Sequence, residues 1–312
     1  MISLKKVDLN SKELIHSFIQ ARAKIEQSLG IYHYSIDPFY NWLSNTGKHF
    51  YYVTEFEDDK VITFLNFTQG GYYRMIEFPY SINNNHIHEK EVFDYAMKNV
   101  AGQAYVSDYT LRYILDGKTY DAIEIADTDF YIDLMNDTWL FSNKYKHDNK
   151  VNVLEKSGNF DFREINYYDK GQIISLFDTW GKHHDLHSKL LFRNYFKEFM
   201  QINLSHCLLQ YGLFYKDKLI ALSIFTPTLE YYCQGIIQWS LRKGDFENCD
   251  RDLRIALSQI GQIMNYLCLN DLKFKNMRFV SIAGVNGNNT GLINHKKETC
   301  QHQISYFKVV NK

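Results

Sequence analysis

The stretch Val280-Ser-Ile-Ala-Gly-Val-Asn-Gly-Asn-Asn-Thr-Gly-Leu292 carries more information about the fold than any other part of the chain. A β-rich run, Met277 to Ile282, leads into this turn of Gly and Asn residues, and Lys296 and Lys297 follow before a last β-like run, Ile304 to Val310. Gly and Asn tolerate positive φ, so such a turn lets the backbone approach a ligand closely. The pattern indicates a binding place for an anionic or carbonyl substrate, and the structural alternative is a long surface loop.

The bulk composition predicts a folded, strand-rich protein. The 312 residues suffice for one large domain or for two. Tyr (24) and Phe (22) are abundant and Pro (3) is scarce, which favours β-structure over disorder. A net charge of −1 argues against a DNA-coating protein, although the segment from Asp271 to Lys312 is locally basic.

The cysteines and the apolar runs exclude several classes of protein. The five cysteines form no C-x-x-C pair, which argues against a structural zinc site and a disulfide scaffold. The chain has no apolar leader segment and no run of 18 apolar residues, so we expect a cytoplasmic protein without a transmembrane segment.

The predicted elements follow the same order in both halves of the chain. The first half contains helices at 11–29 and 38–43, a hairpin at 50–56 and 61–68, a strand at 72–78, a helix at 89–99, a stretch at 104–115 that fits helix or strand, and a helix at 129–139. The second half contains a strand at 160–165, helices at 169–180 and 190–204, a hairpin at 207–215 and 219–226, a strand at 231–242, a helix at 251–267 and strands at 277–282 and 304–310. This repeat of elements predicts an α+β fold with a mixed sheet in each half.

The element order resembles the acetyltransferase-like (GNAT) fold, and short motifs make the resemblance more specific. One motif joins the halves: Asp129-Phe-Tyr131, Lys144, Asn149 and Asn152. A second is Phe160-Asp-Phe-Arg-Glu-Ile165, and the third is Asn286, Gly291, Leu292 and Lys296, with Ile293 where relatives often have Arg. In these passages the chain is similar to the tandem acetyltransferase-like family that includes the catalytic domain of phosphatidylglycerol lysyltransferase (DUF2156-like).

The resemblance implies two tandem GNAT-like repeats, each a mixed, mostly antiparallel sheet flanked by helices. We expect an N-terminal repeat at residues 1–143, a junction at 144–159 and a C-terminal repeat at 160–312 that carries the active site. It also implies an acyltransferase that moves an acyl or aminoacyl group to an amine or hydroxyl of a small-molecule or lipid acceptor. The step from fold to function is an analogy.

The segment from Arg242 to Arg251 indicates which acyl donor the protein would use. Coenzyme A acetyltransferases need a Gly-rich turn whose backbone N–H groups hold pyrophosphate at a helix N-terminus. This segment has one Gly and the acids Asp245, Glu247 and Asp250, which repel phosphate. We therefore expect aminoacyl-tRNA, presenting its single-stranded 3′ end, or a noncanonical acyl donor, rather than acetyl-CoA. A noncatalytic ligand-binding module and a coenzyme A-dependent N-acetyltransferase with a variant loop are the alternatives.

Acyl transfer needs a base, an oxyanion donor and an acid for the leaving group. The candidate catalytic side chains are Asp245, His184 from the cluster His183 to His187, and Tyr306. Simple β-packing explains Tyr306 equally well. The candidate substrate-binding residues come from the Asn/Gly turn, the cationic segment and the central strand: Asn286, Gly287, Asn289, Lys296, Gln238 and Tyr232.

The histidine cluster also has the spacing of a metal site. His187 is four positions after His183, as the second of two ligands on one helix face would be. The Glu that a metalloprotease carries between them is absent, so we expect no metal and interpret the cluster as a helix end or an acceptor-side segment.

Overall fold

The computed structural model describes residues 2–7, 49–68, 70–76, 78–108, 111, 119–135, 151–152, 154–183, 209–229, 232–285, 294, 296–297, 300 and 302–312. The chain divides into two compact units. Unit 1 comprises Met1–Phe130, Gly284–Glu298 and His302–Lys312, and unit 2 comprises Tyr131–Ala283 and Thr299–Gln301. The sequence prediction assigned all of 160–312 to one repeat, whereas contacts group 284–298 and 302–312 with the N-terminal half of the chain.

Unit 1 is built on a mixed sheet. The strands are β1 (Lys5–Lys6), β2 (His49–Glu55), β3 (Lys60–Phe67), β4 (Tyr73–Ile76), β6 (Gln103–Ser107), β13 (His302–Asn311) and β7 (Tyr120–Asp133), in that spatial order, with β5 (Tyr80–Ser81) on β3. The predicted hairpin is confirmed, with β2 antiparallel to β3 from His49 opposite Asn66 to Glu55 opposite Lys60. β4 and β6 are parallel, and β13 is antiparallel to β6.

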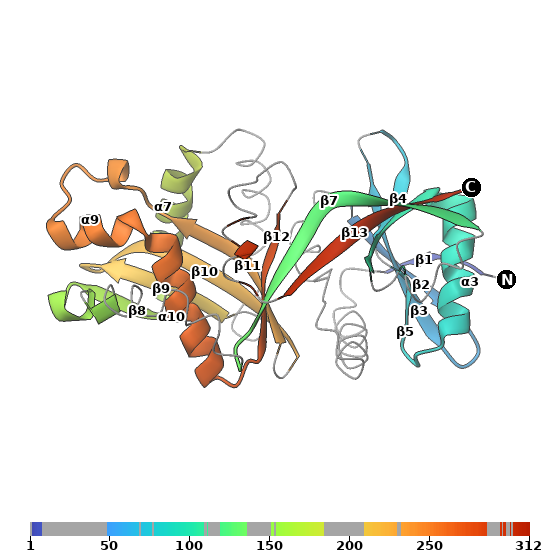
Figure 1. Cartoon of the computed structure of the whole chain (residues 1–312), viewed down its shortest axis with the longest axis horizontal. Coiled ribbons are helices and arrows are strands. Elements are labelled where there is room, and N and C mark those ends of the chain that lie inside the picture. The colour runs from blue at the N-terminus through green and yellow to red at the C-terminus, as the bar shows by residue number, and fades with distance from the viewer. Residues whose placement is uncertain are drawn as a thin grey trace. The chain divides into compact units, whose positions relative to one another are not determined.

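Helix α3 (His86–Ala96) packs on one face of this sheet (Figure 1). It begins at Asn85, whose side chain accepts the backbone N–H groups of Ile87 and His88. One wider turn, Met97–Ala101, continues the helix to Gly102, whose φ of 63° ends it. The core between helix and sheet contains Leu65, Met75, Phe93, Ala104, Val106 and Val309.

The predicted helix at 129–139 is wrong over residues 129–133, which belong to strand β7 (120–133), and its part at 136–139 lies outside the described residues. Phe130, Tyr131 and Ile132 are each at most 1% exposed, and such a continuous buried run of aromatic and β-branched residues fits a strand with neighbours on both sides. β13 and β12 are those neighbours.

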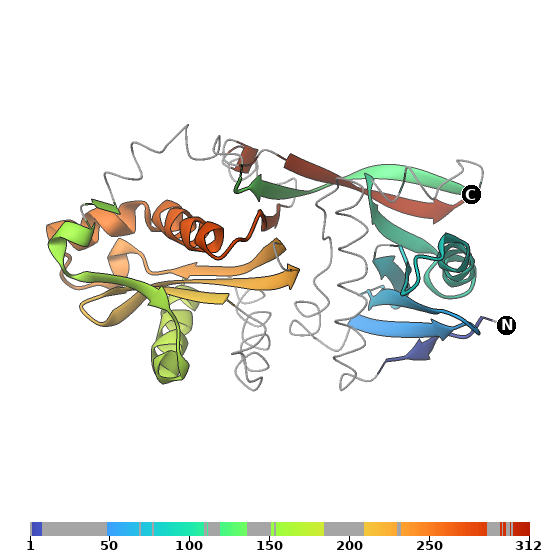
Figure 2. The same ribbon diagram turned by 90° about the horizontal axis from the view of Figure 1, so that it is seen from below.

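Unit 2 is also built on a mixed sheet. The end of β7 is followed in spatial order by β12 (Phe279–Val285), β11 (Tyr232–Ser240), β10 (Lys218–Leu229), β9 (Leu209–Tyr215) and β8 (Phe160–Glu164). The predicted β9–β10 hairpin is confirmed, and its turn has φ of 47° at Lys216 and 65° at Asp217. Helix α7 (Lys170–Gly181) and helix α10 (Ile260–Phe274) cover opposite faces of the sheet (Figure 2).

The predicted helix at 251–267 is two helices. α9 (Arg251–Ser258) ends before Gln259, whose φ of −143° breaks the helical path, and α10 begins at Ile260. The predicted helices at 11–29, 38–43 and 190–204 lie outside the described residues. In the part of the chain that the structure describes, the helices are too short or too polar to traverse a bilayer.

Candidate active site

The candidate site of unit 2 follows strand β11, which pairs with β12 at its start. The two strands are parallel and pair from Tyr232 opposite Phe279 to Gln234 opposite Ser281. At the next residue, Gly235, an added Cβ would lie 3.1 Å from the carbonyl oxygen of Ser281, so the absence of a side chain permits this close approach. β11 then continues to Ser240 along β10 and leads directly into residues 241–250.

The segment 241–250 uses its acidic side chains to hold its own backbone. Asp245 Oδ2 accepts the backbone N–H of Arg242 at 2.7 Å, and a short 3-10 turn covers Lys243–Asp245. Asp250 is the N-cap of α9, and its Oδ1 accepts the backbone N–H of Leu253 at 2.9 Å. These two carboxylates therefore take backbone N–H groups of the kind that would hold a phosphate.

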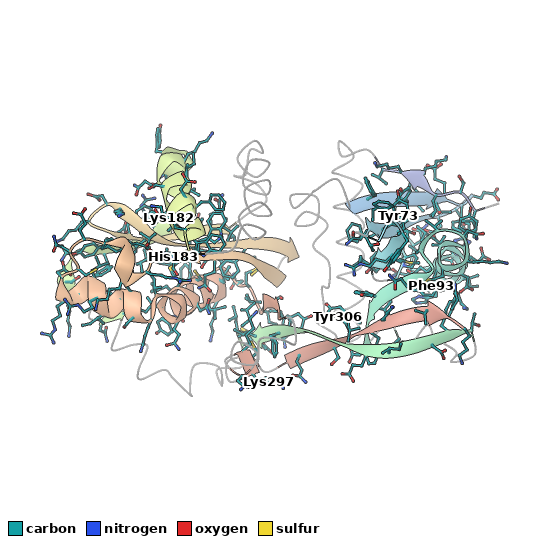
Figure 3. All side chains as sticks on the ribbon, turned by 90° about the horizontal axis from the view of Figure 1, so that it is seen from above. Tyr73, Phe93, Lys182, His183, Lys297 and Tyr306 are labelled. Atoms are coloured by element: carbon teal, nitrogen blue, oxygen red, sulfur yellow. The ribbon has the colours of Figure 1, made fainter. Side chains whose placement is uncertain are left out.

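His183 and Asp245 form the chemically most informative pair of unit 2. His183 Nε2 lies 2.6 Å from Asp245 Oδ1. The Asp245 side chain is 5% exposed, whereas the His183 side chain is 29% exposed. A buried carboxylate thus supports a partly accessible imidazole, which follows the end of α7 (Figure 3).

The protonation state of Asp245 determines which nitrogen of His183 is available. Burial of the Asp245 carboxyl raises its pKa, but the bonds from the Arg242 backbone and His183 outweigh this, and the pKa lies below its ordinary value. Near neutral pH Asp245 is therefore an ionised carboxylate that only accepts hydrogen bonds. It follows that His183 Nε2 carries the proton in this contact, which leaves the lone pair of neutral His183 on Nδ1.

Aromatic packing fixes the end of α7 that carries His183. The Trp180 ring lies 5.8 Å from the Trp239 ring of β11, and Phe177 lies 5.1 Å from the same ring. The backbone N–H of His183 donates to the Trp180 carbonyl at 3.1 Å. Three aromatic side chains therefore hold the imidazole near the segment that follows β11.

The central-strand residues of the prediction have other contacts. The Gln238 amide donates to the Gly261 carbonyl and to Asn265 Oδ1, both at 3.1 Å, and so joins β11 to α10. Tyr232 is the first residue of β11. The thiol of Cys233, also on β11, is fully buried, and this burial raises its pKa, so it is protonated and unreactive.

The remaining predicted residues belong to unit 1 or lie outside the described residues. Tyr306 is on β13 opposite Ser107, and Lys296 is helical and 8% exposed, both in unit 1. Asn286, Gly287, Asn289 and His184 lie outside the described residues. Their roles stay predictions.

Sequence reasoning named the histidine cluster but chose His184, whereas the partner of Asp245 is His183. Helical spacing cannot choose between adjacent histidines at a helix end, because the chain leaves the helix there. The close approach of Gly235 to Ser281 was also missed, and an isolated Gly within the predicted strand was the available signal. Within the described ranges, no three His, Cys, Asp or Glu side chains gather as a metal site would require.

Comparison with known proteins identifies structures with a similar fold. No protein-family model matches the sequence, and no curated protein matches it either. The structure is similar to a conserved protein of unknown function from Bacteroides thetaiotaomicron, with a TM-score of 0.65 and 13% identity over 100% of both chains. It is also similar to FemX, with a TM-score of 0.62 and 8% identity over 97% of this chain and 96% of the other.

A third similar structure is the C-terminal domain (DUF2156) of a putative lysylphosphatidylglycerol synthetase from Agrobacterium fabrum. Its TM-score is 0.58, with 10% identity over 95% of this chain and 92% of the other. The chain has the fold of these proteins. The α+β class and the likeness to a DUF2156 domain predicted from the sequence are thereby confirmed at the level of fold.

Proposed function

We propose that the chain is an acyl- or aminoacyltransferase in which His183, oriented by Asp245, moves the proton. The observation that carries the proposal is the 2.6 Å contact between His183 Nε2 and Asp245 Oδ1, in the segment that follows β11. A buried carboxylate behind an accessible imidazole is an arrangement suited to general-base chemistry. The fold shared with the DUF2156 domain of a putative lysylphosphatidylglycerol synthetase supports a transferase of this kind.

The proposed step conserves atoms and protons. The acceptor amine or hydroxyl attacks the acyl carbon of the donor, and Nδ1 of His183 takes the proton that the acceptor loses. The bond from the acyl carbon to the donor oxygen or sulfur then breaks, and the leaving atom receives a proton from the imidazolium. Asp245 stabilises the imidazolium between these two transfers through its contact with Nε2.

The proposed donor is aminoacyl-tRNA or another donor held without a pyrophosphate cradle. Asp245 and Asp250 already accept the backbone N–H groups of Arg242 and Leu253, which supports this choice over acetyl-CoA. The name of the similar Agrobacterium protein describes synthesis of a lipid that carries an aminoacyl group. A small-molecule or lipid hydroxyl or amine is the proposed acceptor.

Donor binding is the first test. Purified protein is screened by thermal shift against acyl-CoAs and by filter binding against aminoacyl-tRNA, because a ligand that binds only the folded state raises the melting temperature. Binding of aminoacyl-tRNA with turnover supports the proposal. A response to acetyl-CoA alone indicates a coenzyme A enzyme with a variant loop, and no response to either class indicates a noncatalytic module.

The proton-transfer role is tested with His183→Gln and Asp245→Asn once turnover is found. Loss of a general base lowers kcat about 10²- to 10⁴-fold. We expect His183→Gln to lower kcat by a factor in that range, and Asp245→Asn to lower kcat as well. Asp250→Asn is the matched control, because Asp250 holds the same segment without contacting a histidine. Wild-type kcat in His183→Gln would refute the assignment.

A further inference from the structure

The sheet of unit 1 carries a polar surface opposite its core. Met75, Ala104 and Val309 belong to the core that α3 covers (Figure 1). Neighbouring residues on a strand point to opposite faces. Arg74 on β4, Tyr105 on β6 and Lys308 on β13 each adjoin one of these core residues, as Asn66 on β3 adjoins the core residue Leu65. We call these four side chains, Asn66, Arg74, Tyr105 and Lys308, the Arg74 face.

The strand register brings the four residues of the Arg74 face together. Asn66 is directly opposite Arg74, and Tyr105 is directly opposite Lys308. The guanidinium carbon of Arg74 lies 4.4 Å from the centroid of the Tyr105 ring. Two cations, one amide and one aromatic ring therefore form a continuous group across four adjacent strands.

The cations of the Arg74 face lack anionic partners among the described residues. Arg74 makes the ring contact with Tyr105, but it has no ion pair there, and its Nε is buried without a hydrogen bond. Lys308 likewise has no ion pair within the described ranges, and it is half-buried. A buried donor without a partner destabilises a folded protein, so a native structure that keeps one calls for an explanation.

We propose that the Arg74 face binds a phosphate group. The fork of a guanidinium matches two phosphate oxygens, and an ammonium adds a point charge beside it. Tyr105 holds the plane of the Arg74 guanidinium in advance, which lowers the entropic cost of binding. Asn66, opposite Arg74, supplies a further N–H donor.

The composition of the Arg74 face favours a single phosphate over a nucleic acid. Binding to a nucleic-acid backbone uses a line of cations, and its affinity grows with the number of phosphates contacted. Here there are two cations beside one aromatic ring. The expected ligand is a phosphate ester, either a soluble metabolite or a phospholipid headgroup. This site lies in unit 1 and does not depend on the chemistry proposed for His183 and Asp245.

Calorimetry with inorganic phosphate and pyrophosphate at constant ionic strength tests the site. We expect saturable binding to the wild type and affinity lower by about tenfold or more in Arg74→Gln, because two charge-assisted hydrogen bonds are lost. Lys308→Gln should lose less. Lys6→Gln is the matched control, since Lys6 lies 3.9 Å from the Phe50 ring of the same sheet, and it should bind like the wild type. Circular dichroism verifies that each variant is folded.

Two further arms separate the sources of the phosphate. Glycerol 3-phosphate represents a soluble ester, and vesicles with and without phosphatidylglycerol represent a lipid headgroup. Arg74-dependent binding of inorganic phosphate, pyrophosphate, the soluble ester or the phosphatidylglycerol vesicles supports the site and identifies the source. Equal binding by the wild type and Arg74→Gln, no binding of any of these probes by the wild type, or binding of single-stranded RNA alone would overturn it.

Discussion

Two arginines in this molecule lie over aromatic rings in nearly the same way, but their surroundings differ. Arg163 on β8 lies 4.0 Å from the Phe214 ring, and Arg74 on β4 lies 4.4 Å from the Tyr105 ring. Phe214 is opposite Asp161, two residues before Arg163. Tyr105 is opposite Ile76, two residues after Arg74. Sheet geometry alone therefore explains both stacking contacts.

The two arginines differ in the carboxylates that surround them. Arg163 forms two bonds of 2.7 Å to Asp169 and a third contact of 3.1 Å to Asp161. Arg74 has no such carboxylate within the described residues, and its Nε is buried without a hydrogen bond. Arg163 thus stabilises unit 2 by joining β8 to the start of α7, whereas Arg74 holds a charge available for a ligand.

Removal of Asp169 should have the largest effect on stability. Asp169→Ala leaves Arg163 without its main partner and removes the acceptor for the Asn166 backbone N–H. We expect a loss of about 2 kcal/mol in the free energy of unfolding, toward the lower end for charge-assisted bonds because Arg163 is partly exposed. The midpoint of urea unfolding measures this loss. An unchanged midpoint would show that Arg163, like Arg74, adds no stability through an ion pair.

The same pair should give unit 2 a specific pH dependence. The bonds from Arg163 hold the pKa of Asp169 below its ordinary value, although burial opposes this. Its stabilisation is therefore fully present above the ordinary Asp pKa, about 4, and is lost as the pH falls through the lower folded value. We expect the stability difference between wild type and Asp169→Asn to be constant near neutral pH and to shrink below about pH 4. A difference that grows on acidification contradicts this.

Arg74→Met should have the smallest effect, and of the opposite sign. Met keeps the packing against Tyr105 but removes a buried donor without a partner. We expect the free energy of unfolding to stay unchanged or rise by up to about 1 kcal/mol. Urea unfolding without phosphate measures it, and a loss as large as that of Asp169→Ala would mean that Arg74 is a structural residue.

The sequence predicted local elements well because their determinants are local. The hairpins β2–β3 and β9–β10 follow from apolar runs around short charged turns, and both are present. The end of β7, residues 129–133, is predicted as helix from the sequence because its pairing partners β13 and β12 are distant in sequence. The decisive information for such a strand lies in its neighbours, which no local pattern contains.

The same limit applies to the candidate site and to the two arginines. Asp245 was named from the composition of its segment, but its bond to His183 spans 62 residues. Arg163 lies between Phe162 and Glu164, and Arg74 lies between Tyr73 and Met75, so each is a single basic residue in a strand. The contrast between them comes from Asp169, which is near Arg163 in sequence, and from a face of unit 1 that exists only after four strands pair.

The position of β13 in unit 1 has a consequence for the order of events during synthesis. β13 lies between β6 and β7, yet residues 302–311 are translated after all of unit 2. On the ribosome, unit 2 can close its core while β6 still lacks its neighbour. An unpaired strand edge is a template for other chains, so the nascent protein has a period of exposure to aggregation that ends only when this late strand arrives.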